Sequence, residues 1–181
     1  MDDAGHDPST TSTRRAAVTT QAQVQSVRPS LTFKSGAEEA INFYVSLFKN
    51  SRILSLLRSD GEGPIPKGSV LHASFLIDGQ EYTAFDGGEP FAFTEAFSFV
   101  ATCETQEQID ELWTRLTDGG EPGPCGWLKD RFGVSWQVVP AALGEMLANP
   151  KKGNAAKVME ALLKMGKLDL DALERAYRSG T

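Results

Sequence analysis

Apolar residues in the first part of this chain alternate with polar ones in some segments and follow helical spacing in another. The order predicts a short strand at 29–34, a helix after Ser35, and three further strands. Asp78-Gly79, between the last two strands, is typical of a hairpin turn. A βαβββ module is therefore expected over about Pro29–Asp86. Its later strands are expected at 52–58, 70–77 and 81–85, and the apolar face of its helix holds Ala40, Ile41, Tyr44, Leu47 and Phe48.

The same order recurs between Glu95 and Pro140. A strand is expected at 97–102, then a helix with Ile109, Leu112, Trp113 and Leu116 on one face, then strands near 125–129 and 134–139. Pro140 should end the last strand, because proline has no N–H for a sheet ladder. The fold class predicted is therefore α+β, with two βαβββ modules.

Helix starts are marked by capping residues. Ser35 with Glu38, and Thr105 with Gln108, each have the spacing of a capping box, in which the first side chain bonds the N3 amide and the other reaches back. Beyond the modules, Asn154 and Asp169 each precede a helical apolar stripe. Together with a helix at 141–148, they predict a helical extension that runs to about Tyr177.

Three segments follow from these patterns. Residues 1–27 contain no aromatic residue and no apolar periodicity, so we expect a disordered tail there. Residues 28–140 form the two modules, and residues 141–181 form the helical extension.

Composition excludes several classes of function. Residues 29–140 hold 8 Lys or Arg against 16 Asp or Glu, whereas residues 141–181 hold 7 against 5, so an acidic body precedes a basic extension. The acidic body argues against nucleic-acid binding, which needs a basic surface. No apolar run is long enough for a membrane span, and the first residues lack the apolar stretch of a secretory signal. The two cysteines are expected to be reduced, which favours a cytoplasmic location.

Several of these pieces together resemble the PhnB-like branch of the vicinal oxygen chelate superfamily, the relatives of glyoxalase I, in which some proteins are labelled 3-demethylubiquinone methyltransferase-like. The resemblance implies two modules whose curved mixed sheet surrounds a cavity, usually in a homodimer. The pieces that carry it are Leu31-Thr32-Phe33, Ala37-Glu38-Glu39-Ala40, Phe43-Tyr44, His72 with Asp78-Gly79, Phe132 to Trp136, Val158 to Ala161, Lys164-Met165, and Leu170 to Tyr177.

In metal-dependent members of the superfamily, two His and two Glu line the cavity. By element order, those four positions fall here near Pro29, Thr83, Phe97 and Gln137. Proline and phenylalanine side chains cannot ligate a metal, so we expect no metal and no other cofactor in the inherited site. Methyltransferase activity is not expected either, because the chain has no glycine-rich βα turn for S-adenosylmethionine.

The candidate catalytic residues are His72, because an unperturbed imidazole can act as an acid or a base near neutral pH, and Gln137, whose amide can both donate and accept hydrogen bonds. An alternative interpretation places His72 in the core or in a dimer interface. The candidate ligand-binding residues are Thr83, Phe85, Phe97, Trp127 and Ser135. Alternatively, the aromatic residues simply fill the core. Asp86, at a strand end, could bond a ligand hydroxyl, or form a turn.

Two hypotheses about function follow. In the first, the protein is an enzyme that acts on a small organic molecule by metal-independent acid–base chemistry, such as isomerisation, cyclisation or elimination. In the second, it binds or sequesters a small molecule without changing it. Both expect a homodimer, because an open curved sheet leaves edges and an apolar face that need cover. The extension could provide that cover within one subunit or across two.

Overall fold

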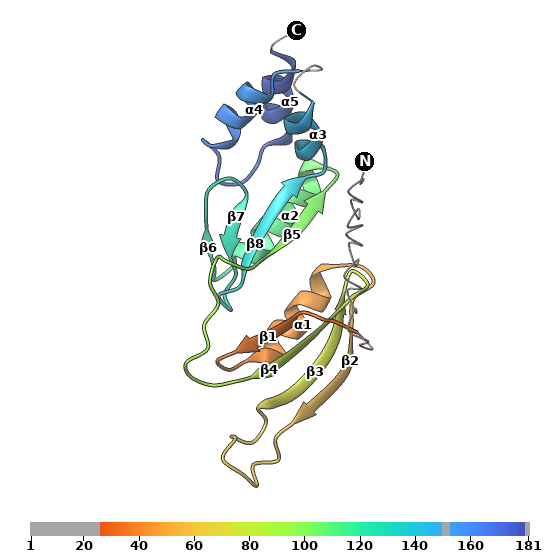
Figure 1. Cartoon of the computed structure of the whole chain (residues 1–181), viewed down its shortest axis with the longest axis vertical. Helices are drawn as coiled ribbons and strands as arrows, with labels where there is room; N and C mark the ends of the chain where they lie inside the picture. Colours follow the sequence, from red (N-terminus) through yellow and green to blue (C-terminus); the bar gives the residue numbers. More distant parts are fainter. Residues whose placement is uncertain (1–25, 150–152, 180–181) are drawn as a thin grey trace, which may run out of the picture.

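The computed structural model describes residues 26–149 and 153–179, and most of the predicted tail lies outside them. These residues form two βαβββ modules and then a group of three helices at the end of the chain (Figure 1). The predicted α+β fold is thus confirmed, and neither sheet is doubly wound. The second module contains a two-residue strand that the sequence pattern did not predict, Glu121–Pro122.

The first module forms a four-stranded mixed sheet in the order β1-β4-β3-β2. β1 and β4 are parallel, and the other neighbours are antiparallel. The turn between β3 and β4 is the expected hairpin, since Asp78 and Gly79 both have positive φ angles, of 47° and 81°. The elements are β1 (Ser30–Phe33), α1 (Ala37–Leu47), β2 (Arg52–Arg58), β3 (Val70–Ile77) and β4 (Gln80–Asp86).

The second module repeats this topology in the order β5-β8-β7-β6. The parallel pair is β5 with β8. β8 ends at Pro140, one residue later than predicted, and the pairing continues because the Ala141 amide donates to the Cys103 carbonyl at 2.8 Å. The elements are β5 (Ser98–Cys103), α2 (Gln106–Thr117), β6 (Glu121–Pro122), β7 (Trp127–Lys129) and β8 (Ser135–Pro140).

The start of α1 differs from the predicted capping box. Gly36 is the N-cap, with φ 82°, and no side chain caps the helix from that position. Instead, the carboxylate of Asp86 accepts from the Ala37 amide at 2.9 Å and from the Val70 amide at 2.7 Å. Asp86 therefore ties the first turn of α1 to β3 and β4, so it is neither a turn former nor a free ligand group. Glu38 pairs with Arg58 instead of reaching back.

The other predicted helix starts are confirmed. Thr105, Asn154 and Asp169 each accept a hydrogen bond from the amide three residues later. In the capping box of α2, Gln108 reaches back one residue further than expected, to the Glu104 amide at 2.8 Å. These caps satisfy amides that the first helical turn leaves without partners.

One continuous core joins the two modules. At its centre the buried carboxylate of Asp130 accepts from the Tyr44 hydroxyl at 2.8 Å and from the Trp136 indole at 2.9 Å. Its other oxygen accepts from the amides of Phe132 and Val134. A buried carboxylate is tolerated when donors surround it, and here one donor comes from the first module and three from the second.

The extension packs onto the second module of its own chain, as Figure 1 shows for the blue helices above β5 and β8. Its helices are α3 (Ala142–Ala148), α4 (Ala155–Leu162) and α5 (Leu170–Arg178). They enclose a small separate core of Met146, Val158, Leu168 and Leu173.

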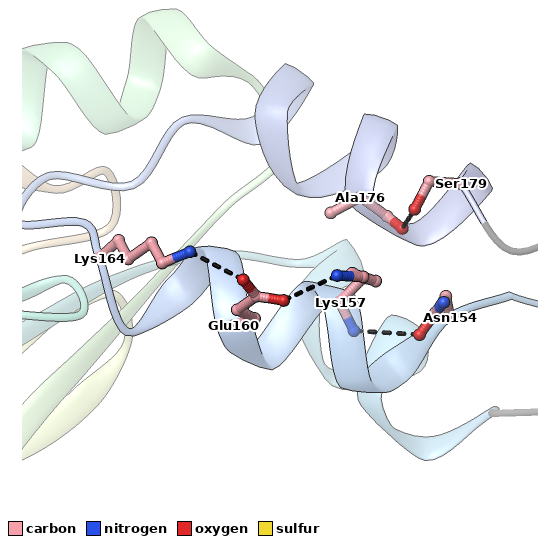
Figure 2. Close-up of polar contacts among 6 residues, drawn as sticks. All are labelled: Asn154, Lys157, Glu160, Lys164, Ala176 and Ser179. Atoms are coloured by element: carbon pink, nitrogen blue, oxygen red, sulfur yellow. Dashed lines mark hydrogen bonds and ion pairs between the residues drawn. The ribbon is translucent and has the colours of Figure 1, made fainter.

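Along the surface of α4, Glu160 lies between Lys157 and Lys164, with ion pairs of 2.9 and 2.8 Å (Figure 2). The hydrogen bonds from Lys164 and Lys157 lower the pKa of Glu160 to about 2. The same view shows Asn154 capping the helix through the Lys157 amide.

Candidate small-molecule site on the open sheet faces

Each sheet has one face packed into the core and one face without a helix. On β8, Trp136 and Val138 point into the core and are almost fully buried, whereas Gln137 between them lies on the opposite, open face. On β5, Val100 is on the same open face, and it is 57% exposed. The open face of the second sheet is therefore a surface on which side chains can meet a ligand.

The two modules match residue by residue in their parallel strand pairs. Ser30 pairs with Thr83 in the first module, as Ser98 pairs with Ser135 in the second. Two residues further on, Phe85 holds the position in the first sheet that corresponds to Gln137 in the second. Neither Thr83 nor Phe85 adds a carboxylate or an imidazole to the open faces.

A cavity of about 430 Å³ lies against the β6–β7 side of the second sheet. Its lining combines rings and prolines with a few polar groups: Glu95, Pro122, Pro124, Trp127, Lys129 and Ser135. Flat apolar walls with a few polar groups are typical of sites for small organic molecules. Two of the predicted ligand-binding residues, Trp127 and Ser135, thus meet in this cavity.

Ser135 is the most unusual residue of the cavity. Its side chain is almost completely buried, with 1% of the residue exposed, and its hydroxyl has no hydrogen-bond partner within the described residues. Leaving a buried hydroxyl without a partner costs about 1–3 kcal/mol. A bound molecule with a polar atom at this position would remove that cost.

An ion pair stands beside the hydroxyl. Lys129 lies directly across from Ser135 in the β7–β8 register, and its ammonium contacts the Glu95 carboxylate at 2.5 Å. The hydrogen bond with Glu95 raises the pKa of Lys129, and the same bond lowers the pKa of Glu95. Glu95 comes from the connection between the modules and is largely exposed, so this connection reaches over to the cavity.

Gln137 lies next to the cavity, across from Trp127 in the strand register. Its side-chain amide donates to the Ser98 hydroxyl at 2.9 Å. The amide is half-buried, so this bond orients it while its carbonyl oxygen remains available to accept from a ligand.

Three other predicted site residues lie on the first sheet. Thr83 and Phe85 are half-buried on its open face, and His72 on β3 is exposed, so its interpretation as a core histidine is wrong. Gln137 lies on β8 of the second sheet, so the two candidate catalytic residues sit on different sheets.

Phe97 lies just before β5 and is 44% exposed. Its ring contacts Phe99 edge-on, with 5.3 Å between centroids. It is not among the residues that line the cavity against β6 and β7.

The residues present do not fit the divalent metal of the superfamily. Element order matches its ligands to Pro29, Thr83, Phe97 and Gln137, and the strand register puts Phe85 in place of Thr83 as the counterpart of Gln137. None of these side chains is a carboxylate or an imidazole, which such a metal needs. Within residues 26–149 and 153–179, no three side chains of His, Cys, Asp or Glu are grouped as a metal site would require.

S-adenosylmethionine does not fit the first β–α turn either. That turn contains the single glycine Gly36, and the amide of Ala37 at the helix start is already occupied by Asp86. In Rossmann-type sites for dinucleotides and nucleosides, the backbone amides at the start of the first helix must be free to bind an anion or a ligand hydroxyl.

Three polar residues of the site were not predicted. Lys129 could have been predicted from strand alternation, because it follows Trp127 by two residues and therefore lies on the same face of β7. Ser98 and Glu95 could not, since their positions depend on the β5–β8 pairing and on the path of the connection between the modules.

A second, larger hollow of about 800 Å³ lies between the modules. Its walls include Phe48, Tyr82, Phe99 and Trp136, whose rings belong to the joint core. The Trp136 indole is already bonded to Asp130, so this hollow offers no buried polar group in need of a partner comparable to Ser135.

The family model described as 3-demethylubiquinone-9 3-methyltransferase matches residues 25–139. A Bacillus cereus protein described as a 3-demethylubiquinone-9 3-methyltransferase, PhnB protein, is 41% identical, with a TM-score of 0.60 over 65% of this chain and 100% of its own. Protein PA1353 from Pseudomonas aeruginosa is 22% identical, with a TM-score of 0.53 over 63% of this chain and 96% of its own.

The fosfomycin resistance protein FosX from Listeria monocytogenes is 17% identical, with a TM-score of 0.51 over 70% of this chain and 98% of its own, which shows a shared fold. No curated protein matches the chain. None of the helices in the described residues is long and apolar enough to cross a membrane.

Proposed function

Because this chain belongs to the family described as 3-demethylubiquinone-9 3-methyltransferase, whose PhnB-like members share the glyoxalase-type fold, we propose that it binds a small organic molecule in the cavity of its second sheet. The observation that carries the proposal is the buried hydroxyl of Ser135, which has no partner and lines that cavity. The ligand is expected to be flat, because Trp127, Pro122 and Pro124 form the walls, and to carry a carbonyl oxygen that accepts a hydrogen bond from Ser135.

A matched pair of probes tests this. 4-Hydroxyacetophenone and 4-ethylphenol are similar in size and shape, but only the first has a carbonyl oxygen. Titration of the labelled protein, followed by NMR at the amides of residues 122–137, should give tighter binding of the first compound by about 5- to 50-fold, the range of one hydrogen bond of about 1–2.3 kcal/mol. Equal affinities, or no shifts in this segment, would contradict the proposal.

Acid–base chemistry is a second candidate, and one observation favours it. His72 is exposed on the open face of the first sheet, where a ligand could contact its imidazole. For catalysis, a ligand would have to reach both sheets, and His72 would act as the base that moves a proton. Native mass spectrometry of the purified protein identifies any co-purified molecule, and incubation with that molecule shows whether it is altered. Unchanged turnover in His72→Ala would exclude this role.

We also propose a homodimer. Apolar side chains remain exposed on β2 and at the start of β3, where Leu54, Leu57 and Leu71 are 45%, 59% and 39% exposed. The extension does not cover them, because it packs on the second module of its own chain. Light scattering should give twice the chain mass at micromolar concentration, and Leu57→Lys should weaken the association. A monomer in the unmodified protein would end this idea, whereas truncation at Pro150 should leave the dimer intact.

A further inference from the structure

The segment between α4 and α5 is hydrogen-bonded to the loop that forms one wall of the cavity. The carbonyl of Met165 accepts from the Cys125 amide at 2.7 Å, and the carbonyl of Gly166 accepts from the Gly126 amide at 2.8 Å. This loop contains Pro124 and leads directly into Trp127, and both line the cavity. The extension is thus hydrogen-bonded directly to the backbone of the cavity wall.

Gly126 shows how closely these layers meet. A Cβ atom at this position would lie 2.8 Å from the carbonyl oxygen of Val138 on β8 and 3.1 Å from the side chain of Leu168 in the extension. Its φ angle of 83° is also one that residues with a side chain rarely adopt. The loop therefore passes between β8 and the extension with no free space, and a displacement of Leu168 must be felt by the loop.

The segment itself is fixed by the first turn of α2. The side-chain amide of Gln106 donates to the Leu168 carbonyl at 3.1 Å and accepts from the Leu170 amide at 2.8 Å. One turn further along α2, Asp110 pairs with Lys167 at 2.5 Å. Because a Gln side chain offers both a donor and an acceptor, this one residue holds the backbone on either side of Asp169, at the start of α5.

We propose that the extension is the outer support of the cavity wall and that Gln106 is its positioning residue. The proposal rests on the proposed small-molecule site, and it assigns a supporting role in binding to the segment of residues 165–170, which the matched family segment of residues 25–139 does not include. Gln106 does not line the cavity. It fixes the position of Leu168. Leu168 packs against the loop at Gly126, and this loop sets the position of Trp127 in the cavity wall.

The test compares two alanine substitutions in the same helical turn. Gln106→Ala removes both bonds to the extension, whereas Gln108→Ala removes a bond to the Glu104 amide and touches neither the extension nor the loop. Exchange of the Cys125 and Gly126 amides should become about tenfold faster in Gln106→Ala, as expected for lost hydrogen bonds that hold a local structure. The Kd for 4-hydroxyacetophenone should rise about three- to tenfold.

Gln108→Ala should leave the exchange of these two amides and the Kd unchanged. Faster exchange in Gln106→Ala with an unchanged Kd would overturn the supporting role and leave the small-molecule site standing. Equal effects of both substitutions would also overturn it, since they would show only a general loosening of α2. If the probe does not bind the unmodified protein at all, the proposed site fails and the supporting role fails with it.

Discussion

Tyr44 on α1 of the first module donates a hydrogen bond of 2.8 Å to the carboxylate of Asp130 in the second. Both side chains are buried, and the two residues are 86 positions apart in the chain. Burial and the neighbouring Asp130 charge raise the pKa of Tyr44 far above its ordinary value, so the phenol stays protonated and remains a donor. This bond links the two modules through the polar centre of their common core.

Tyr44→Phe should destabilise the protein by about 1–3 kcal/mol, because the buried Asp130 carboxylate would lose one of its donors. Urea unfolding measures this change. Tyr82→Phe is the matched control, since the Tyr82 hydroxyl has no hydrogen-bond partner among residues 26–149 and 153–179 and the side chain is only half-buried. If the two variants lose the same stability, the Tyr44–Asp130 bond does not contribute as argued.

Asp86→Ala should lower the free energy of unfolding by about 1–2 kcal/mol, the usual cost of losing a side chain that caps a helix. It should not alter the affinity for 4-hydroxyacetophenone, because Asp86 serves α1 and β3 and not the cavity. Asp60→Ala, which removes an exposed aspartate bonded only to the Glu62 amide, is the control for stability. A weakened affinity with full stability would make Asp86 a ligand group.

These residues also show what the sequence can predict. Thr105, Asn154 and Asp169 were recognisable as helix caps because their partners lie three residues away. Ser35 has the same local pattern, but Gly36 adopts a left-handed conformation there and a carboxylate 49 residues away from Ala37 takes the capping position. Local spacing cannot reveal such a distant partner.

In the candidate site, too, local sequence pattern predicts some features, whereas others depend on contacts between distant residues. Strand alternation alone places Ser135 and Gln137 on one face and Trp136 on the other, as the structure has them. That Gln137 bonds Ser98, and that Glu95 reaches Lys129, depends on strand pairing and on the path of a connection. The hydroxyl of Ser135 could be recognised as unpartnered only after every neighbour was in place.

The extension should lose stability when Glu160 is protonated. Its folded pKa of about 2 lies below the ordinary 4.5, so its contribution is fully present above about pH 4.5 and disappears as the pH falls towards 2. Amide exchange within α4, corrected for the intrinsic pH dependence, should therefore quicken over this range. Glu160→Gln should remove the dependence. A side-chain NMR titration that finds Glu160 at an ordinary pKa would contradict the two ion pairs.

Glu95→Ala should strengthen the binding of 4-hydroxyacetophenone. The Ser135 hydroxyl is almost fully buried, and Lys129, which pairs with Glu95, lies across from it in the strand register. A ligand can therefore reach this hydroxyl only when neighbouring side chains move. Releasing Lys129 should lower the Kd about two- to fivefold, since an exposed ion pair contributes less than about 1 kcal/mol. Titration calorimetry measures it. Glu89→Ala, in the same connection but paired with Lys34, should have no effect, and a weaker affinity in Glu95→Ala would make this carboxylate part of the binding surface.

The most direct test of the small-molecule site compares Ser135→Ala with Ser98→Ala. Both substitutions remove a serine hydroxyl from the same register position of a parallel strand pair, but only Ser135 is without a partner and lines the cavity. We expect Ser135→Ala to abolish the preference for 4-hydroxyacetophenone over 4-ethylphenol, with the two Kd values becoming equal, and Ser98→Ala to retain it. If the preference survives in Ser135→Ala, the buried hydroxyl does not recognise the ligand and the account of this site is wrong.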